Sequence, residues 1–282
     1  MNKVYKIITD KIIEQLEKNI IPWRKTWASP LHFPANYITN KCYSGVNVFL
    51  LGTSSYTSRY WLTYNQAKLR GGNVIKGQKG TTIIFWKLSK KEDKTTGKET
   101  SSAMLRYYNV FNLEQCENVS ELPNREDTQV IETGSKPIEE LENFVADLKD
   151  IPKIVHIKNS AYYDTLKDVI NMPLLKNFDK AELYYSTLFH EIIHSTGHDK
   201  RLKRDMEGNT VTTKTAKRSY AKEELIAEIG ACFLNSFAGI ENIELDNSVS
   251  YIKGWLRVLK SDPCFIVSAS GKAQKAVDYL IS

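Results

Sequence analysis

Residues 184–205 read YYSTLFHEIIHSTGHDKRLKRD, and the run His190-Glu191-Ile192-Ile193-His194 within them decides how the rest of the chain is interpreted. Apolar residues recur at helical spacing and predict a helix over residues 179–195. Histidines four residues apart on a helix lie on one face, about one turn (~6 Å) apart. Both ring nitrogens can then reach one Zn²⁺ at ~2.0–2.1 Å, so the run predicts two ligands of a zinc site.

The acid between these histidines predicts a chemical role. Glu191 lies beside the first histidine. Zinc lowers the pKa of a bound water to about 7, and a neighbouring carboxylate can accept the proton that this water releases. We therefore expect Glu191 to be the catalytic base. The competing interpretation is a buried helix whose histidines only satisfy hydrogen bonds.

A catalytic zinc site needs three protein ligands and one open position. Lys200 stands where a third histidine would complete the pattern HExxHxxGxxH, and lysine is not a ligand there. His198 follows His194 by four residues, but histidines on three successive helical turns would span ~12 Å, too far for one ion. We expect Gly197 to turn the chain first, which leaves His198 at the rim of the site.

Two acids in the next predicted helix, residues 220–238, are the remaining candidates. Glu224 and Glu228 lie four residues apart on one face of the largely apolar stretch AKEELIAEIGACF. Buried carboxylates are normally paired or bound to a metal, so acids turned toward a core need a partner. The residues alone leave open which of the two is the ligand. Glu223 is expected to face solvent.

The chain divides into two predicted modules, which together make an α+β protein. In residues 1–118 we expect helices over 4–18 and 60–70, and a hairpin of strands 81–88 and 104–112 around a polar tip at 89–102. Residues 119–136 are the expected linker. Residues 137–282 are expected to be mostly helical (137–148, 179–195, 220–238, 248–260 and 272–281) with a small sheet built on strands 153–158 and 168–172.

The formal net charge of +6 hides an asymmetry between these modules. Residues 1–118 hold 18 Lys and Arg against 8 Asp and Glu, a net charge of +10, and 16 of the 30 aromatic residues. Residues 119–282 hold 21 against 25, a net charge of −4. Because Lys and Arg neutralise phosphates and aromatic rings stack on bases, the first module is expected to bind nucleic acid.

Apolar runs in the chain are short. None approaches the 18 residues typical of a membrane span, and the charged N-terminus does not match a signal peptide. We therefore expect no membrane partner and a location in the cytoplasm.

Two clusters of basic and aromatic residues are the expected DNA contacts. Stacking favours single strands over duplex, and no helix-turn-helix or zinc-finger spacing indicates base reading in a groove. The competing interpretation is a core of aromatics beneath a solvated basic face. The first cluster is Trp23, Arg24, Lys25 and Trp27, and the second is Arg59, Tyr60, Trp61, Lys68, Arg70, Lys76 and Lys79.

The run HExxH, followed by a loop and by E-x-x-A-E on the next helix, resembles the gluzincin pattern of zinc peptidases. This resemblance implies that Glu224 ligates zinc and that Glu228 orients a zinc-bound histidine. Zincins also hold an edge strand above the metal, which makes DVINMP, residues 168–173, the candidate strand. Tyr162 or Tyr163 would reach the cleft from nearby, or both would pack against the sheet.

The ordered set of motifs resembles antirestriction proteins of the ArdC type over nearly the whole chain. Residues 184–205 and 220–234 resemble their zincin-like metallopeptidase domain. IPWRKTW (21–27), YWLTYNQAKLRGGNVIKGQKGT (60–81) and YYNVFNLEQ (107–115) resemble their N-terminal, single-stranded-DNA-binding domain. The resemblance implies a mobile-element protein with Zn²⁺ as cofactor, and with single-stranded DNA and a protein or peptide substrate as partners.

Two functions of different classes are therefore expected as alternatives. One is an enzyme, a zinc metallopeptidase attached to a single-stranded-DNA-binding module. The other is a binding protein that shields incoming DNA from restriction, with a structural or inactive metal centre. A purely structural site has no need for Glu191, which favours the enzyme.

Overall fold

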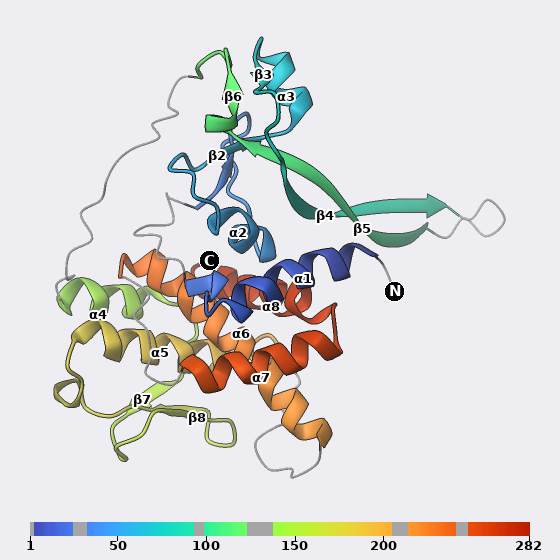
Figure 1. The fold of residues 1–282 in the computed structure, drawn as a ribbon. Helices are drawn as coiled ribbons and strands as arrows, with labels where there is room; N and C mark the ends of the chain where they lie inside the picture. The colour runs from blue at the N-terminus through green and yellow to red at the C-terminus, as the bar shows by residue number, and fades with distance from the viewer. Residues whose placement is uncertain (1–2, 25–32, 93–98, 123–137, 205–213, 241–247) are drawn as a thin grey trace.

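The computed structural model describes residues 3–24, 33–92, 99–122, 138–204, 214–240 and 248–282. It confirms the α+β prediction. A helical body built mainly from the C-terminal half lies below a smaller part rich in strands, from which one long hairpin projects (Figure 1).

The helical body is organised around α6 (Lys214–Ala238), which packs against both α5 (Ala181–Ser195) and α8 (Phe265–Leu280). Helices α4 (Ile138–Asp147) and α7 (Ser248–Ser261) complete it. Glycine at position 230 lets α5 and α6 approach closely, because a Cβ added there would lie 2.8 Å from Cδ1 of the buried Ile193. This close approach brings the HExxH run beside the acids of α6. Helices α6 and α8 begin six and seven residues earlier than the sequence predicts.

A three-stranded sheet lies beside α5, in the order β7 (Lys153–Val155), β9 (Val169–Asn171), β8 (Tyr162–Asp164). The short 3-10 helix η4 (Leu175–Asn177) follows β9. The prediction that residues 168–173 form the edge strand is wrong, because β9 pairs on both sides, parallel to β7 and antiparallel to β8. Strand β8 instead forms one edge of the sheet, next to β9, at residues for which the sequence predicted no strand.

The strand-rich part contains a four-stranded sheet in the order β1 (Ala35–Asn36), β2 (Tyr60–Leu62), β5 (Glu99–Asn112), β4 (Thr81–Glu92). Strands β3 (Asn73–Val74) and β6 (Cys116–Glu117) form a second, two-stranded sheet, and η3 (Leu113–Gln115) lies just before β6. Two short helices, α2 (Val46–Gly52) and α3 (Tyr64–Leu69), accompany them.

Two predictions for this part are corrected. Residues 60–70 are not one helix, because Thr63 caps α3 with its side chain and separates it from the aromatic strand β2. The polar stretch 89–102 is not a loop throughout, since the ladder of β4 and β5 continues out to the pair Glu92 and Glu99. Backbone pairing does not require apolar side chains, so a polar hairpin can extend into solvent.

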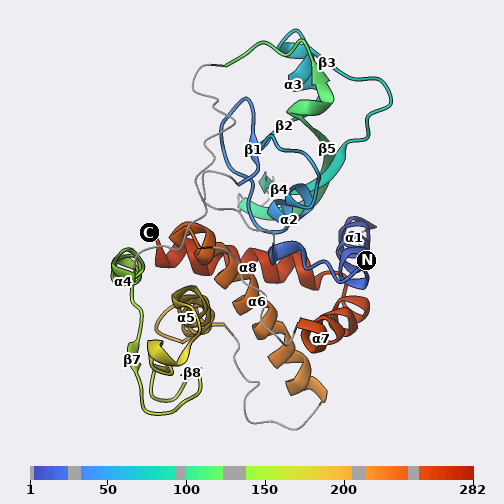
Figure 2. The same ribbon diagram turned by 60° about the vertical axis from the view of Figure 1, so that its left-hand side comes forward.

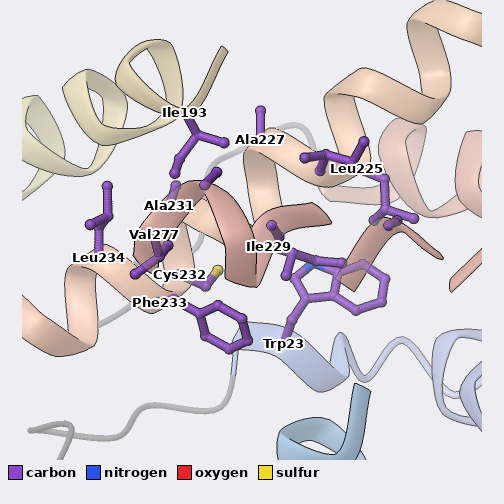
Figure 3. Packing of buried hydrophobic residues seen from close by; sticks show 14 of the residues in the cluster. Trp23, Ile193, Leu225, Ala227, Ile229, Ala231, Cys232, Phe233, Leu234 and Val277 are labelled. Carbon is purple, nitrogen blue, oxygen red and sulfur yellow. The ribbon is translucent and has the colours of Figure 1, made fainter. Parts of the chain in front are cut away.

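The N-terminal segment packs into the helical body. Helix α1 (Lys3–Glu17) lies against α7, and its Ile8, Ile12 and Leu16 are buried in the core that α6 and α8 share. The 3-10 helix η1 (Pro22–Arg24) follows, and Figure 3 shows Trp23 among residues of α6. Turned by 60°, Figure 2 shows α1 beside α7 and below the hairpin. The module boundaries at 118 and 136 stay a prediction, and most of the predicted linker, residues 123–136, lies outside the described residues.

None of the helices in the described part of the chain combines the length and apolar content that crossing a bilayer requires.

Candidate metal centre

Helix α5 places the two histidines of the HExxH run side by side toward α6. Their Nε2 atoms lie 3.1 Å apart and their rings meet edge to face, with centroids 4.7 Å apart. Other faces of α5 are buried by Leu188, Ile192 and Ile193, which fixes the helix in the core. The pair therefore has the one-face arrangement that the spacing predicts.

Glu224 of α6 faces both histidines. Its carboxylate oxygens lie 3.5 Å from His190 Nε2 and 3.5 Å from His194 Nε2. A tetrahedral site with bonds of 2.0–2.1 Å has donor atoms roughly 3.3–3.4 Å apart. The observed separations are close to this, with Oε2 of Glu224 near His190 and Oε1 near His194. All three ligand atoms lie within 4.8 Å of one another. The donors thus fit one small divalent cation, with a fourth position left for a water or substrate.

Glu228, the other candidate ligand, lies behind His190. Its Oε2 is 3.9 Å from Nδ1, the ring nitrogen on the side away from Glu224, so this contact is electrostatic. The opposite carboxylate oxygen accepts hydrogen bonds from Arg24, with Oε1 2.8 Å from Nε and 2.6 Å from Nη2. The orienting role that the gluzincin resemblance implies for Glu228 stays a prediction.

Glu223 is buried, so the prediction that it faces solvent is wrong. Its Oε1 lies 3.5 Å from Nδ1 of His194 and 2.6 Å from Nη2 of Arg204. Burial opposes its ionisation, but contacts with His194 and Arg204 outweigh this and lower the pKa of Glu223. Each histidine therefore has a carboxylate near its Nδ1, and each of these carboxylates is paired with an arginine. The sequence analysis missed Glu223 because helical periodicity placed it off the face that carries Glu224 and Glu228.

The charges favour a cation at the three donors. Burial lowers the pKa of His194, but hydrogen bonds to Glu223 and Glu224 outweigh it and raise that pKa to about 10. Burial likewise opposes ionisation of Glu224, yet the two histidines hold the pKa of Glu224 far below its usual range. A metal ion binds the unprotonated imidazole, so metal binding at these donors releases a proton and depends on pH.

Glu191 lies next to His190 on α5 and is only 8% exposed. Its negative charge contributes to the raised pKa of His194, so the carboxylate lies within electrostatic reach of the donors. The catalytic role of Glu191 stays a prediction.

The predicted rim residues lie apart from the three donors. His198 sits in the turn after α5, where its Nδ1 accepts a hydrogen bond from the backbone N–H of Lys200. Tyr163 is buried rather than at a rim, because its hydroxyl donates to Asp168 (2.8 Å) and accepts from Arg201 (3.1 Å). Arg201 also pairs with Asp168, so these three side chains join the β8–β9 hairpin to the loop after α5.

Several predicted DNA contacts are core residues instead, and those predictions are wrong. Trp23, Tyr60 and Trp61 are at most 3% exposed, and a base cannot stack on a ring that is already covered.

The basic residues of the two clusters differ in exposure. Arg24 forms an ion pair with Glu228. Arg59 and Arg70 are half-buried beside Cys42 and Glu121. Lys25 and Trp27 lie outside the described residues, and the exposed members of the two clusters are Lys68, Lys76 and Lys79.

A different aromatic surface lies on the projecting hairpin. The aromatic hairpin patch consists of Phe85, Trp86, Lys87, Arg106, Tyr107 and Tyr108, and all six are exposed. Phe85 lies opposite Arg106 in the ladder and contacts Tyr108 edge to face, with centroids 5.1 Å apart. The sequence analysis predicted both strands but missed this patch. A strand pattern alone does not show which part of a hairpin is buried against the core and which part is exposed.

Two family models match the chain, one on each part. Residues 2–111 match the N-terminal domain of anti-restriction factor ArdC, and residues 139–272 match a zincin-like metallopeptidase. The chain is also similar to crystal structures of the antirestriction ArdC protein from the R388 plasmid. The metal-free structure has 36% identity and a TM-score of 0.76, and the alignment covers 98% of this chain and 95% of that one. The Mn(II)-bound structure has 36% identity and a TM-score of 0.78, with 98% and 96% covered.

Curated relatives include DNA primase TraC of Escherichia coli, 31% identical over 98% of this chain. The chain spans only 27% of the length of that relative. A Sinorhizobium fredii protein called "Uncharacterized protein y4eC" is 28% identical over 98% of this chain and 91% of its own length.

Proposed function

This chain belongs to the ArdC antirestriction family. We propose that it is a zinc-dependent metallopeptidase that also binds single-stranded DNA, and that it is encoded by a mobile genetic element. The observation that carries the enzymatic part is the convergence of His190, His194 and Glu224 within 4.8 Å, with Glu191 buried beside them.

His190, His194 and Glu224 would hold the metal, and two imidazoles with one carboxylate suit Zn²⁺ with one position open. When bound, the metal supplies a Lewis acid that polarises a peptide carbonyl and makes a water more acidic. The relative solved with Mn(II) gives a second ion to compare. Affinities measured for both ions test the zinc assignment.

The chain's own residues supply proton transfer and substrate alignment. Glu191 takes a proton from the attacking water and passes it to the nitrogen of the leaving amine. Strand β8 ends its sheet, so its outer backbone edge offers hydrogen bonds to an extended peptide. Glu223 and Glu228 hold the two histidine rings from behind.

Peptide cleavage by wild type, Glu191→Gln and His190→Ala tests the enzymatic proposal. Glu191→Gln is expected to bind metal like wild type and to lose cleavage by about 100-fold or more, because it removes only the base. His190→Ala is expected to lose both metal and cleavage. Cleavage that survives in both variants contradicts the proposed mechanism. If metal-loaded wild type cleaves nothing in a peptide library, the alternative of a non-proteolytic DNA-shielding protein is favoured.

The aromatic hairpin patch supports the DNA-binding part of the proposal. It carries four exposed aromatic rings, two on each face of the hairpin, and Lys87 and Arg106 lie on the face of Phe85 and Tyr108. Rings beside cations bind single strands by stacking and phosphate neutralisation. Opposite residues of an antiparallel pair share a face, so Phe85, Arg106 and Tyr108 form one surface. Trp86 and Tyr107 lie on the other face of the hairpin.

Fluorescence anisotropy with a labelled oligonucleotide tests this surface. Phe85→Ala combined with Tyr108→Ala is expected to weaken binding about 10-fold or more, since each stacked base is worth ~1–3 kcal/mol. Lys87→Ala combined with Arg106→Ala should reduce the slope of log affinity against log salt by about 1.4, at ~0.7 for each phosphate contact on single strands. The exposed Leu69→Ala on α3 serves as a control. Wild-type affinity in both pairs of variants contradicts the assignment.

A further inference from the structure

We propose that Arg24, contributed by the N-terminal segment, is a positioning residue of the metal centre and acts through Glu228 on His190. The inference rests on the proposed metal centre. It extends that centre beyond the helices that carry the ligands, because Arg24 is separated from Glu228 by 204 residues of sequence.

Each of the two histidines lies near a carboxylate that pairs with an arginine, but the two arginines come from different parts of the chain. Behind His194, Glu223 is held by Arg204, which follows α5 and also donates to the carbonyl of Ile193 (2.8 Å). That support is internal to the helical body. Behind His190, the corresponding arginine is Arg24 of η1, from the part of the chain that matches the ArdC N-terminal domain.

The contact between Arg24 and Glu228 is nearly closed to solvent. The side chains are 8% and 12% exposed, and both Nε and Nη2 of Arg24 contact one carboxylate oxygen. This leaves the other oxygen, Oε2, turned to Nδ1 of His190. The arginine therefore orients the carboxylate as well as neutralising it. Removing such a partner leaves an unpaired buried charge, which strongly destabilises the folded protein.

The backbone of Arg24 is fixed by its neighbour. Trp23 is fully buried, with its ring edge-on to Trp255 of α7 at 5.1 Å and to Phe49 of α2 at 6.1 Å between centroids. Helix η1 also contacts α6, which carries Glu228. The guanidinium thus enters the site from an anchored position, which is what a positioning residue needs.

Mn²⁺ affinity of the full-length protein, measured by calorimetry, tests the proposal. Arg24→Met keeps the apolar stem and removes the charge, and it is expected to weaken Mn²⁺ binding about 10-fold. Glu228→Gln should weaken it at least as much. The double variant should bind no more weakly than Glu228→Gln alone, because the proposed effect of Arg24 on the metal centre passes through that carboxylate. Arg24→Lys should restore most of the affinity and leave a loss of about 3-fold relative to wild type.

Thr9→Val is the matched control for general damage to the N-terminal segment. Thr9 of α1 is buried, and its hydroxyl donates to the carbonyl of Pro263 at 2.6 Å, away from Glu228. Its loss should lower the melting temperature of the metal-free protein and leave Mn²⁺ affinity unchanged. A merely structural role for Arg24 predicts the same pattern for Arg24→Met.

Wild-type affinity in Arg24→Met, or losses that multiply in the double variant, would overturn the role of Arg24. If Arg24→Met does not fold, Arg24→Lys is compared with wild type directly. A small loss that disappears in the Glu228→Gln background then supports the proposal, and affinity equal to wild type contradicts it. Mn²⁺ binding that survives His190→Ala instead refutes the proposed metal centre, so the two failures are distinguishable.

Discussion

At the scale of single residues, Trp23 shows how environment decides what a side chain does. Its sequence neighbours suggest a nucleic-acid contact, but the ring is fully buried between α2, α6 and α7. We expect Trp23→Ala to lower the free energy of unfolding by about 3–5 kcal/mol, the usual cost of removing a buried Trp. Urea unfolding measures this. A loss below about 1 kcal/mol, or weaker DNA binding by the folded variant, would show that the ring is exposed in solution.

Sequence reasoning could name the proposed metal donors because their relationships are local. The spacing of His190 and His194 defines one helix face, and the resemblance of the next helix to the gluzincin pattern favours Glu224 over Glu228. Arg24 and Glu223 could not be assigned in this way. Arg24 meets Glu228 only through tertiary packing, and Glu223 finds its partners only when α5 and the loop after it fold against α6.

At the scale of elements, the distance between α5 and α6 sets the geometry of the centre. Gly230→Ala places a methyl group less than 3 Å from three side-chain atoms of Ile193. Overpacking of this kind costs ~1–3 kcal/mol and should move Glu224 away from the histidines, so stability and metal affinity fall together. Calorimetry and urea unfolding measure the two. Adding Ile193→Ala should restore part of the metal affinity, and an unaffected Gly230→Ala protein would contradict this account of the helix contact.

The link between the β8–β9 hairpin and the loop after α5 predicts a pH dependence. Burial opposes ionisation of Asp168, but hydrogen bonds from Arg201 and Tyr163 outweigh it and lower the pKa of Asp168 from 3.8 to about 2. A lowered folded-state pKa contributes stability that is present above the unfolded pKa and is lost as pH falls toward the folded value. Asp168→Asn should therefore lower the free energy of unfolding by roughly 2 kcal/mol above pH 5, and by progressively less between about pH 4 and 2.

Urea unfolding of wild type and Asp168→Asn across this pH range checks the dependence. A stability difference that stays constant between pH 5 and 3 would mean that Asp168 is not held ionised by Arg201. The element itself was only half predicted from sequence. The strand at 169–171 was expected, but β8 was not, because three residues are too few to establish a strand pattern and the pairing decides which strand is the edge.

At the scale of the whole molecule, the two family regions are joined by a shared core. Helix α1, η1 and α2 bury Ile8, Trp23 and Phe49 in the cluster that includes Phe233 and Trp255 of the helical body. The charge asymmetry of the sequence suggested two modules with different partners, and composition cannot report packing between them. The predicted order of helices and strands gave the α+β class correctly. The exposed aromatic rings and cations could be assigned to the projecting hairpin only from the structure.

The central claim is that one metal ion is held by His190, His194 and Glu224. Crystals of the zinc-loaded protein measured at the zinc absorption edge test it most directly. The account predicts one anomalous peak within about 2.0–2.2 Å of Nε2 of both histidines and of a Glu224 carboxylate oxygen, with Glu228 and Glu223 outside bonding distance. A peak bonded to Glu228 in place of Glu224, or no peak between the two helices, would contradict it.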